Sequence, residues 1–343
     1  MALLKVTSPH AHRPYDTGWV MRQVMLATIP GIFALTWFYG FGTLVNIIWA
    51  CIVAVASEAL FMKIRGRPVS FYLKDCSALV TAVLLGIALP PYAPWWVVMI
   101  GVVFAIMIAK HLYGGMGYNP FNPAMVGYVI LLISLPIPMT QWAAPHMISD
   151  GGFIGPVAAF LNNFGLQTLD VDAYTMATPL DVMKQNNNLM VDQLWAANPQ
   201  FGWFGGLGWE WANLGFLLGG LYLLSRRVYT WHAPVSMLAA LSLCALINYD
   251  GGSSASGGSP MFHLFTGGTM LGAWFIVTDP VTSAVSNKGK IAYGACIGVL
   301  VYVIRVWGNY PDAIAFAVLL MNFSAPFIDH YTQPRTYGHR SKK

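Results

Sequence analysis

A polar stretch near the middle of the chain carries the side chains best suited to covalent chemistry. It reads DAYTMATPLD over residues 172–181, with two threonine hydroxyls and two flanking aspartates. Pro179 biases Thr178 towards an extended backbone, which presents the Thr178 hydroxyl outward. The same residues predict a plain helix start, because Thr178 is a good N-cap, Pro179 suits the first helical position and Asp181 falls where a capping-box acid would lie. An acceptor hydroxyl and a structural cap are both consistent with this stretch.

Glu58 is the one carboxylate well inside an apolar run. Ionisable groups inside a membrane span are unfavourable and usually functional, so an ion pathway and a polar contact with another protein of a complex are two interpretations. Lys63 and Arg65 lie close by in the sequence, and an ion pair that reaches out to the membrane surface is the structural alternative. Lys110 and His111 are expected to mark the inner end of a span rather than to form a catalytic pair.

The remaining candidates are interpreted structurally. Asp279 precedes Pro280 and predicts a turn or a helix cap, and His263 is expected to lie at the membrane interface. The cysteines are spread along the chain without a CxxC pair and are interpreted as small buried hydrophobes. Neither an iron–sulfur cluster nor another metal site is expected in this chain. The cysteines are Cys51, Cys76, Cys244 and Cys296.

The composition indicates that the elements positioning these residues are membrane spans. Of the 343 residues, 57% are hydrophobic and only 9% are charged, whereas a soluble domain is about 25% charged. Apolar runs of about 16–20 residues recur along the chain and are long enough to cross a bilayer as helices. Soluble enzymes are therefore excluded, and an all-α polytopic membrane protein with about ten transmembrane helices is predicted. The predicted spans are 21–39, 44–62, 76–90, 95–110, 124–140, 209–224, 232–248, 262–278, 291–306 and 312–328.

The distribution of charge predicts the topology. With these spans, all but two of the 18 Lys and Arg residues fall on one side, and the exceptions are Lys184 and Arg305. Positive residues are retained in the cytoplasm, so both termini are predicted to be cytoplasmic. The net charge of +5 is explained by this asymmetry. This distribution of charge predicts that the chain contacts a lipid bilayer and not a nucleic acid.

The chain divides into two membrane halves around one large outer loop. A weak echo between the halves, with Asn122-Pro123 in the first and Asp279-Pro280 in the second, is consistent with an internal repeat. Membrane proteins built from repeats commonly bind ligands where the repeats meet. The predicted segments are a cytoplasmic tail at 1–20, a first membrane half at 21–140, an outer loop at 141–208, a second membrane half at 209–328 and a basic cytoplasmic tail at 329–343.

The stretch at 172–178 resembles the acceptor motif of proteins that carry FMN through a phosphoester to threonine. In those proteins a flavin transferase outside the membrane moves FMN from FAD to the last threonine of the motif. The resemblance implies that Thr178 is the phosphoryl-bearing residue and that Thr175 and Asp172 are recognition elements. Met176 departs from the glycine of the usual pattern but leaves the acceptor hydroxyl in place.

Two inner segments resemble signatures of the NqrB/RnfD family, whose members belong to the sodium-translocating NADH:quinone reductase and to the Rnf complex. They are GGMGYNPFNPAMVG at 114–127 and FIVTDPVTS at 275–283, the latter followed by NKGK at 287–290. The resemblance covers nearly the whole chain, and the short N-terminal tail is closer to the Rnf (RnfD) branch. It implies membership of a bacterial inner-membrane complex, with the loop that bears the flavin on the periplasmic side.

The Rnf resemblance implies a function for the assembly and a smaller part for this chain. The complex would couple electron transfer between ferredoxin and NAD to Na⁺ or H⁺ movement, with the Rnf subunits A, B, C, E and G as partners. This chain would contribute covalent FMN as an electron relay, and relatives also hold riboflavin non-covalently. Little or no activity is expected of the chain alone.

Two other functions remain consistent with the sequence. The corresponding protein of a quinone reductase, from the same superfamily, would keep the flavin and change the terminal electron acceptor. A flavin-free solute permease or channel would use the spans, the repeat and the broken helices for transport. The presence of covalent flavin separates the relay from the permease.

Overall fold

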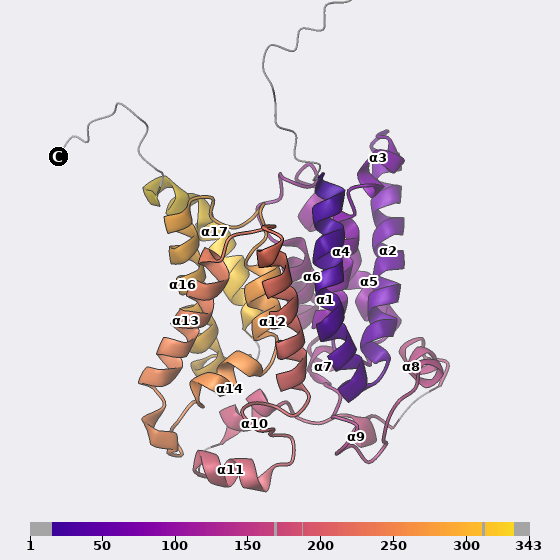
Figure 1. Ribbon diagram of the computed structural model, residues 1–343. Coiled ribbons are helices and arrows are strands. Elements are labelled where there is room, and N and C mark those ends of the chain that lie inside the picture. Colours follow the sequence, from indigo (N-terminus) through magenta and orange to yellow (C-terminus); the bar gives the residue numbers. More distant parts are fainter. Residues whose placement is uncertain (1–15, 168–169, 187, 311–312, 333–343) are drawn as a thin grey trace, which may run out of the picture.

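Helices account for all the regular elements in the part of the chain described by the computed structural model, residues 16–167, 170–186, 188–310 and 313–332. Much of the predicted tails at 1–20 and 329–343 lies outside these residues. The helices form a bundle with the start of α1 and the end of α17 at one end, and α8 to α11 at the opposite end (Figure 1). The predicted all-α polytopic fold is confirmed.

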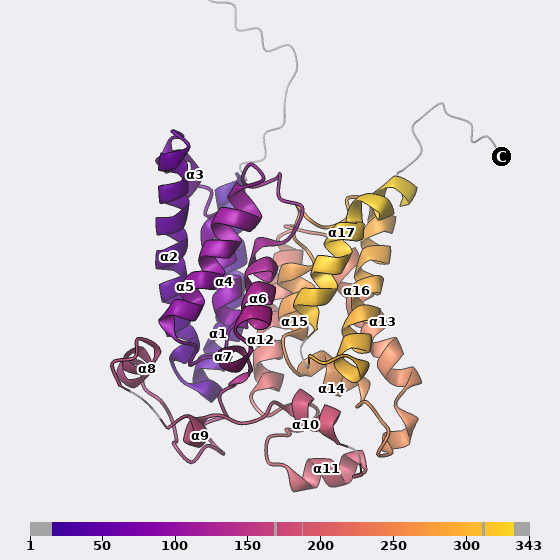
Figure 2. The same ribbon diagram turned by 180° about the vertical axis from the view of Figure 1, so that it is seen from behind.

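The first half contains the helices of the first five predicted spans, and Figure 2 shows them packed beside the second half. They are α1 (Thr17–Tyr39), α2 (Gly42–Ile64), α3 (Val69–Leu73), α4 (Ser77–Ala88), α5 (Trp95–Val103), the π-helix η1 (Phe104–His111), α6 (Pro123–Ser134) and α7 (Pro136–Thr140). The second half comprises α12 (Trp209–Ser225), α13 (His232–Ile247), η2 (Asp250–Gly252), α14 (Pro260–Phe265), α15 (Thr269–Leu271), the π-helix η3 (Gly272–Ile276), α16 (Asn287–Trp307) and α17 (Ile314–Thr332).

The predicted spans differ in how continuous they are. Among the described residues, α1, α2, α16 and α17 are long and apolar enough to cross a membrane as single helices. The predicted span at 262–278 is instead broken into α14, α15 and η3. Irregular backbone at membrane depth is tolerated where protein surrounds it or where it lines a cavity. The broken span therefore needs polar partners inside the bundle.

The two halves meet along α1 and α12, which pack closely. A Cβ atom added to Gly215 of α12 would lie 2.7 Å from the backbone nitrogen of Gly31, so only glycine allows this approach. In each half one helix packs on two others: α2 on α4 and α5, and α13 on α14 and α16. This recurring order is consistent with the predicted repeat. The two dipeptides of the sequence echo occupy unequal positions, since Asn122-Pro123 lies before α6, the fifth predicted span of its half, and Asp279-Pro280 lies after η3, the third.

The outer segment is a folded unit and not a bare loop. It contains α8 (Pro156–Asn163), α9 (Val171–Tyr174), α10 (Pro179–Gln185) and α11 (Val191–Ala197). A small apolar core holds α10 and α11 against α14 of the membrane bundle. Its buried members are Leu180, Met183, Val191, Leu194, Phe201 and Phe262. This core fixes α10, and with it the segment predicted to accept flavin, at the end of the bundle opposite the start of α1.

Candidate functional site

Thr178 is the N-cap of α10, as the sequence predicts. Its backbone is extended, with φ −70° and ψ 155°. The Thr178 hydroxyl donates a hydrogen bond to Asp181 Oδ2 (2.6 Å) and accepts one from the backbone N–H of Asp181 (3.2 Å). The Thr178 N–H donates to the same carboxylate oxygen (3.0 Å). This capping box holds the half-buried hydroxyl in one orientation.

The residues before Thr178 are tied to the segment that leaves α7. Thr175 forms an isolated antiparallel bridge with Ala143. The N–H of Met176 donates to the carbonyl oxygen of Trp142 (3.1 Å) through the backbone alone, so this contact does not require glycine at position 176. Asp172 lies in the short helix α9, and its side chain falls outside the described residues. The structure therefore places Thr175 and Thr178 together on the outer segment.

A recess of about 10 Å³ adjoins Thr178 and includes Tyr39, Gln200 and Trp209 in its wall. Gln200 Oε1 is buried and has no hydrogen-bond partner among the described residues. The same holds for Lys184 Nζ, in the last turn of α10. Burial lowers the pKa of the Lys184 ammonium, and the Asp181 carboxylate offsets part of this shift. The recess is too small for the ring system of a flavin.

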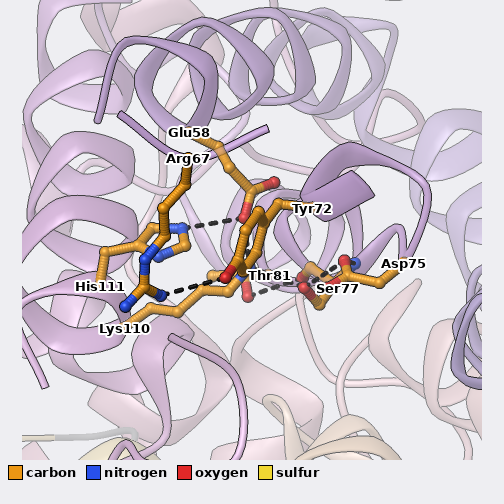
Figure 3. Close-up of polar contacts among 8 residues, drawn as sticks. All are labelled: Glu58, Arg67, Tyr72, Asp75, Ser77, Thr81, Lys110 and His111. Atoms are coloured by element: carbon orange, nitrogen blue, oxygen red, sulfur yellow. Dashed lines mark hydrogen bonds and ion pairs between the residues drawn. The ribbon is translucent and has the colours of Figure 1, made fainter. Parts of the chain in front are cut away.

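Glu58 belongs to a buried ion cluster between α2, α4 and η1 (Figure 3). Its Oε1 atom lies 2.7 Å from Lys110 Nζ and 2.9 Å from His111 Nε2. All three side chains are buried, at 3% exposure or less. The sequence alternative that paired Glu58 with Lys63 or Arg65 is wrong, since both of those residues are exposed. The partners of Glu58 are determined by the packing of the helices and not by proximity in the sequence.

The cluster continues from Lys110 to the inner end of the bundle. The ammonium of Lys110 also donates to Ser77 Oγ (2.6 Å), and Ser77 Oγ donates to Asp75 Oδ1 (2.6 Å). A π-helix places Lys110 and His111, and such segments are frequent at functional sites. Lys110 and His111 are the last two residues of η1, at the end of the predicted span, and both are buried inside the bundle. One feature of the sequence could have indicated that Lys110 and His111 are functional: both residues lie just before the signature at 114–127.

A cavity of about 670 Å³ lies between the two halves at their inner end. Both signature segments contribute to its wall, together with Lys110 from the cluster. Asn122 Nδ2 donates to Asp279 Oδ2 (3.4 Å), which joins the two segments. Asp279 also accepts from the N–H of Val281 (3.1 Å), as the predicted turn requires. The indole nitrogen of Trp274, another wall residue, is buried and has no hydrogen-bond partner among the described residues.

A second buried cation supports the broken span in the second half. Arg305 donates to the carbonyl oxygen of His263 (2.9 Å) and to Thr269 Oγ1 (2.9 Å). Its Nη2 also approaches the carbonyl oxygen of Thr266 (3.5 Å). These carbonyls lie where α14 ends and cannot continue a helical ladder. His263 itself is buried inside the bundle, at 1% exposure.

The fold and these sites define a polytopic all-α membrane protein with a folded outer segment, a buried ion cluster and a cavity between two halves. Comparison with known proteins then identifies the family. The NQR2, RnfD, RnfE family matches residues 5–338, and the chain belongs to this family.

Curated relatives align along nearly their whole length. A protein of Cellvibrio japonicus (strain Ueda107) is 57% identical over 347 residues, which cover 100% of this chain and 97% of the relative. One of Ectopseudomonas mendocina (strain ymp) is 58% identical over 340 residues, with 99% and 97% covered. Both relatives are named as the D subunit of an ion-translocating oxidoreductase complex.

Proposed function

We propose that this chain is the D subunit of an Rnf-type complex of the bacterial inner membrane. The complex couples electron transfer between ferredoxin and NAD to the translocation of Na⁺ or H⁺. Identity of 57% to a D subunit across the full chain supports this assignment over a quinone-reductase protein or a permease. The Rnf subunits A, B, C, E and G are the proposed partners, so the chain alone has little activity.

The contribution of the chain is to hold FMN as an electron relay, esterified to Thr178 on the periplasmic side. One observation carries this proposal: the motif threonine is a half-buried N-cap on a segment that packs at the outer end of the bundle. The fit is supported by Gln200 in the wall of the recess beside Thr178, whose buried Oε1 atom has no hydrogen-bond partner among the described residues. When bound, FMN supplies the redox chemistry, while the chain positions it and tunes its surroundings.

The capping box has a consequence for the attached flavin. Esterification removes the hydroxyl proton that Thr178 donates to Asp181. It also brings an anionic phosphodiester next to the Asp181 carboxylate, and like charges repel. We therefore expect the side chain of Asp181 to turn away from Thr178 after modification. Because the adjoining recess measures about 10 Å³, the flavin ring would not fit inside it and would be held outside the recess.

In-gel fluorescence of the denatured chain, co-expressed with the flavin transferase, tests the attachment. Thr178→Asn removes the acceptor hydroxyl but keeps a good N-cap, so the chain folds and the band is dark. Thr178→Ser keeps both the hydroxyl and the N-cap, so its band stays fluorescent. Thr175→Val leaves the acceptor Thr178 in place, so its band is expected to stay fluorescent as well. A dark wild-type band beside a fluorescent positive control for the transferase would refute the proposal and favour the permease.

The cavity between the halves is the proposed site for a non-covalent riboflavin. Its volume of about 670 Å³ lies within the range of small-molecule sites, about 300–1,000 Å³. The unpartnered indole N–H of Trp274 supplies a donor for a carbonyl oxygen of the ring. Trp274→Phe is expected to lower the amount of flavin released on denaturation while the covalent flavin stays constant. Equal release from wild type and Trp274→Phe would argue against this contact.

A further inference from the structure

The part of the outer segment around α8 exposes apolar side chains although it lies outside the predicted membrane spans. Val157 and Phe160, three residues apart on one side of α8, are 71% and 46% exposed. Phe153 before the helix and Leu166 after it are exposed as well. Residues 151–167 contain no Asp, Glu, Lys or Arg. Exposed apolar side chains grouped in this way mark a contact with lipid or with another protein.

We propose that α8 is an interfacial helix, which lies in the surface of the bilayer with Val157 and Phe160 against lipid. Such a helix does not span the membrane but buries one apolar side at the boundary between headgroups and acyl chains. Three features of the structure favour lipid: the depth of α8 along the bundle, the tryptophans beside it and the absence of charge. The inference does not depend on FMN at Thr178.

Contacts with α2 place α8 beside the membrane bundle. Asn163 is buried, and its Nδ2 atom donates to Asn46 Oδ1 (3.0 Å) and to the carbonyl oxygen of Pro91 (3.1 Å). The ring of Phe164 packs edge-on against the indole of Trp49, with 5.1 Å between the ring centroids. Asn46 and Trp49 lie in the second turn of α2, about 6–10 Å from its start. Both views show α8 at the side of the bundle, outward from α2 (Figure 1, Figure 2).

Tryptophans mark the level of the membrane surface next to α8. The indole N–H of Trp49 donates to the carbonyl oxygen of Trp95 (2.9 Å), and Trp95 and Trp96 begin α5 with partly exposed rings. Tryptophan is enriched at membrane interfaces, because its ring is apolar and its N–H is polar. α2 also exposes Ile48 and Ile52 within its predicted span, as a helix that faces lipid does.

The absence of charge favours lipid over a protein partner. Protein interfaces use complementary charges to select and orient the partner, and residues 151–167 offer none. Lipid requires only an apolar side at the right depth. An interfacial α8 gives the outer segment a second attachment, in addition to the apolar core that joins α10 and α11 to α14. The stretch at 172–178 lies between these two attachments in the sequence and is thereby held near the membrane surface.

Fluorescence quenching in phosphatidylcholine nanodiscs tests the position of α8. The full chain, with its four native cysteines replaced by alanine, carries one new cysteine labelled with an environment-sensitive dye. In Phe160→Cys the dye is expected to be quenched more strongly by phosphatidylcholine with a nitroxide near the headgroup than by iodide in the water. Val157→Cys is a second position, which is expected to behave in the same way and covers the case in which loss of the Phe160 ring disturbs the fold.

Two further positions calibrate the two quenchers. Ile52→Cys on α2 is the reference for lipid contact, and Ala196→Cys is an exposed position on α11, at the far end of the outer segment from the bundle (Figure 1). Quenching of both α8 labels by iodide at the level of Ala196→Cys would overturn the proposal. Protection of both labels from both quenchers would overturn it as well, because protein and not lipid would then cover α8.

Discussion

Removing one member of the Glu58–Lys110 pair is expected to destabilise the chain strongly. The two side chains are buried, and their charged atoms are 2.7 Å apart. Lys110→Met would leave the Glu58 carboxylate inside the bundle with the His111 ring as its remaining hydrogen-bond partner. Breaking a buried pair in this way costs about 3–5 kcal/mol, because an uncompensated charge stays buried.

The double variant Glu58→Gln with Lys110→Met measures the interaction between Glu58 and Lys110 apart from the effect of each single substitution. Both charges are then absent, so the loss of stability is expected to be smaller than the sum of the two single losses by about 2–3 kcal/mol, the upper range for contacting residues. The free energy of unfolding in detergent, followed by circular dichroism, measures all four corners of this cycle.

Lys63→Met is the matched control for Lys110→Met. Lys63 lies on α2 close to Glu58 in the sequence but is exposed, so its removal is expected to change stability by less than about 1 kcal/mol. Losses that simply add in the double variant, or a larger loss for Lys63→Met than for Lys110→Met, would refute the cluster as the environment of Glu58.

Three further outcomes follow from the buried cations and the capping box. Arg305→Met is expected to lower the free energy of unfolding by about 3 kcal/mol, since the buried carbonyl oxygens of His263 and Thr266 lose the guanidinium and keep only the one hydroxyl of Thr269 that they share. Arg305→Lys keeps a charged donor and is expected to lose less; an equal loss in the two variants would contradict this. Burial lowers the pKa of Lys184, so the unfolded chain binds more protons, and the stability of the unmodified chain should rise with pH from the lowered value up to about 10.4. The same rise in Lys184→Met would exclude Lys184 as its source. Asp181→Asn removes the charge beside the phosphodiester and is expected to raise the melting temperature of the flavinylated chain; a lowered value would show that the carboxylate is needed.

Local and compositional features of this protein could be predicted from the sequence. Low charge and long apolar runs specify a polytopic helical bundle, because each span satisfies its own backbone hydrogen bonds. The capping box of Thr178 and Asp181 was also predictable, since both partners lie within one helical turn. The family signatures at 114–127 and 275–283 pointed to inner segments, and the structure joins these segments at Asn122 and Asp279.

Contacts between distant residues were decided by the tertiary structure. Glu58 pairs with residues 52 and 53 positions away, whereas charge and proximity alone favoured Lys63 and Arg65. In the sequence, Arg305 is an exception to the distribution of positive charge. The structure explains its position, because Arg305 binds carbonyl oxygens at the break after α14. In each case the physical reason is the same: a charge buried among helices is stabilised by whichever polar groups the packing of those helices brings within hydrogen-bond distance, and that packing depends on the whole chain.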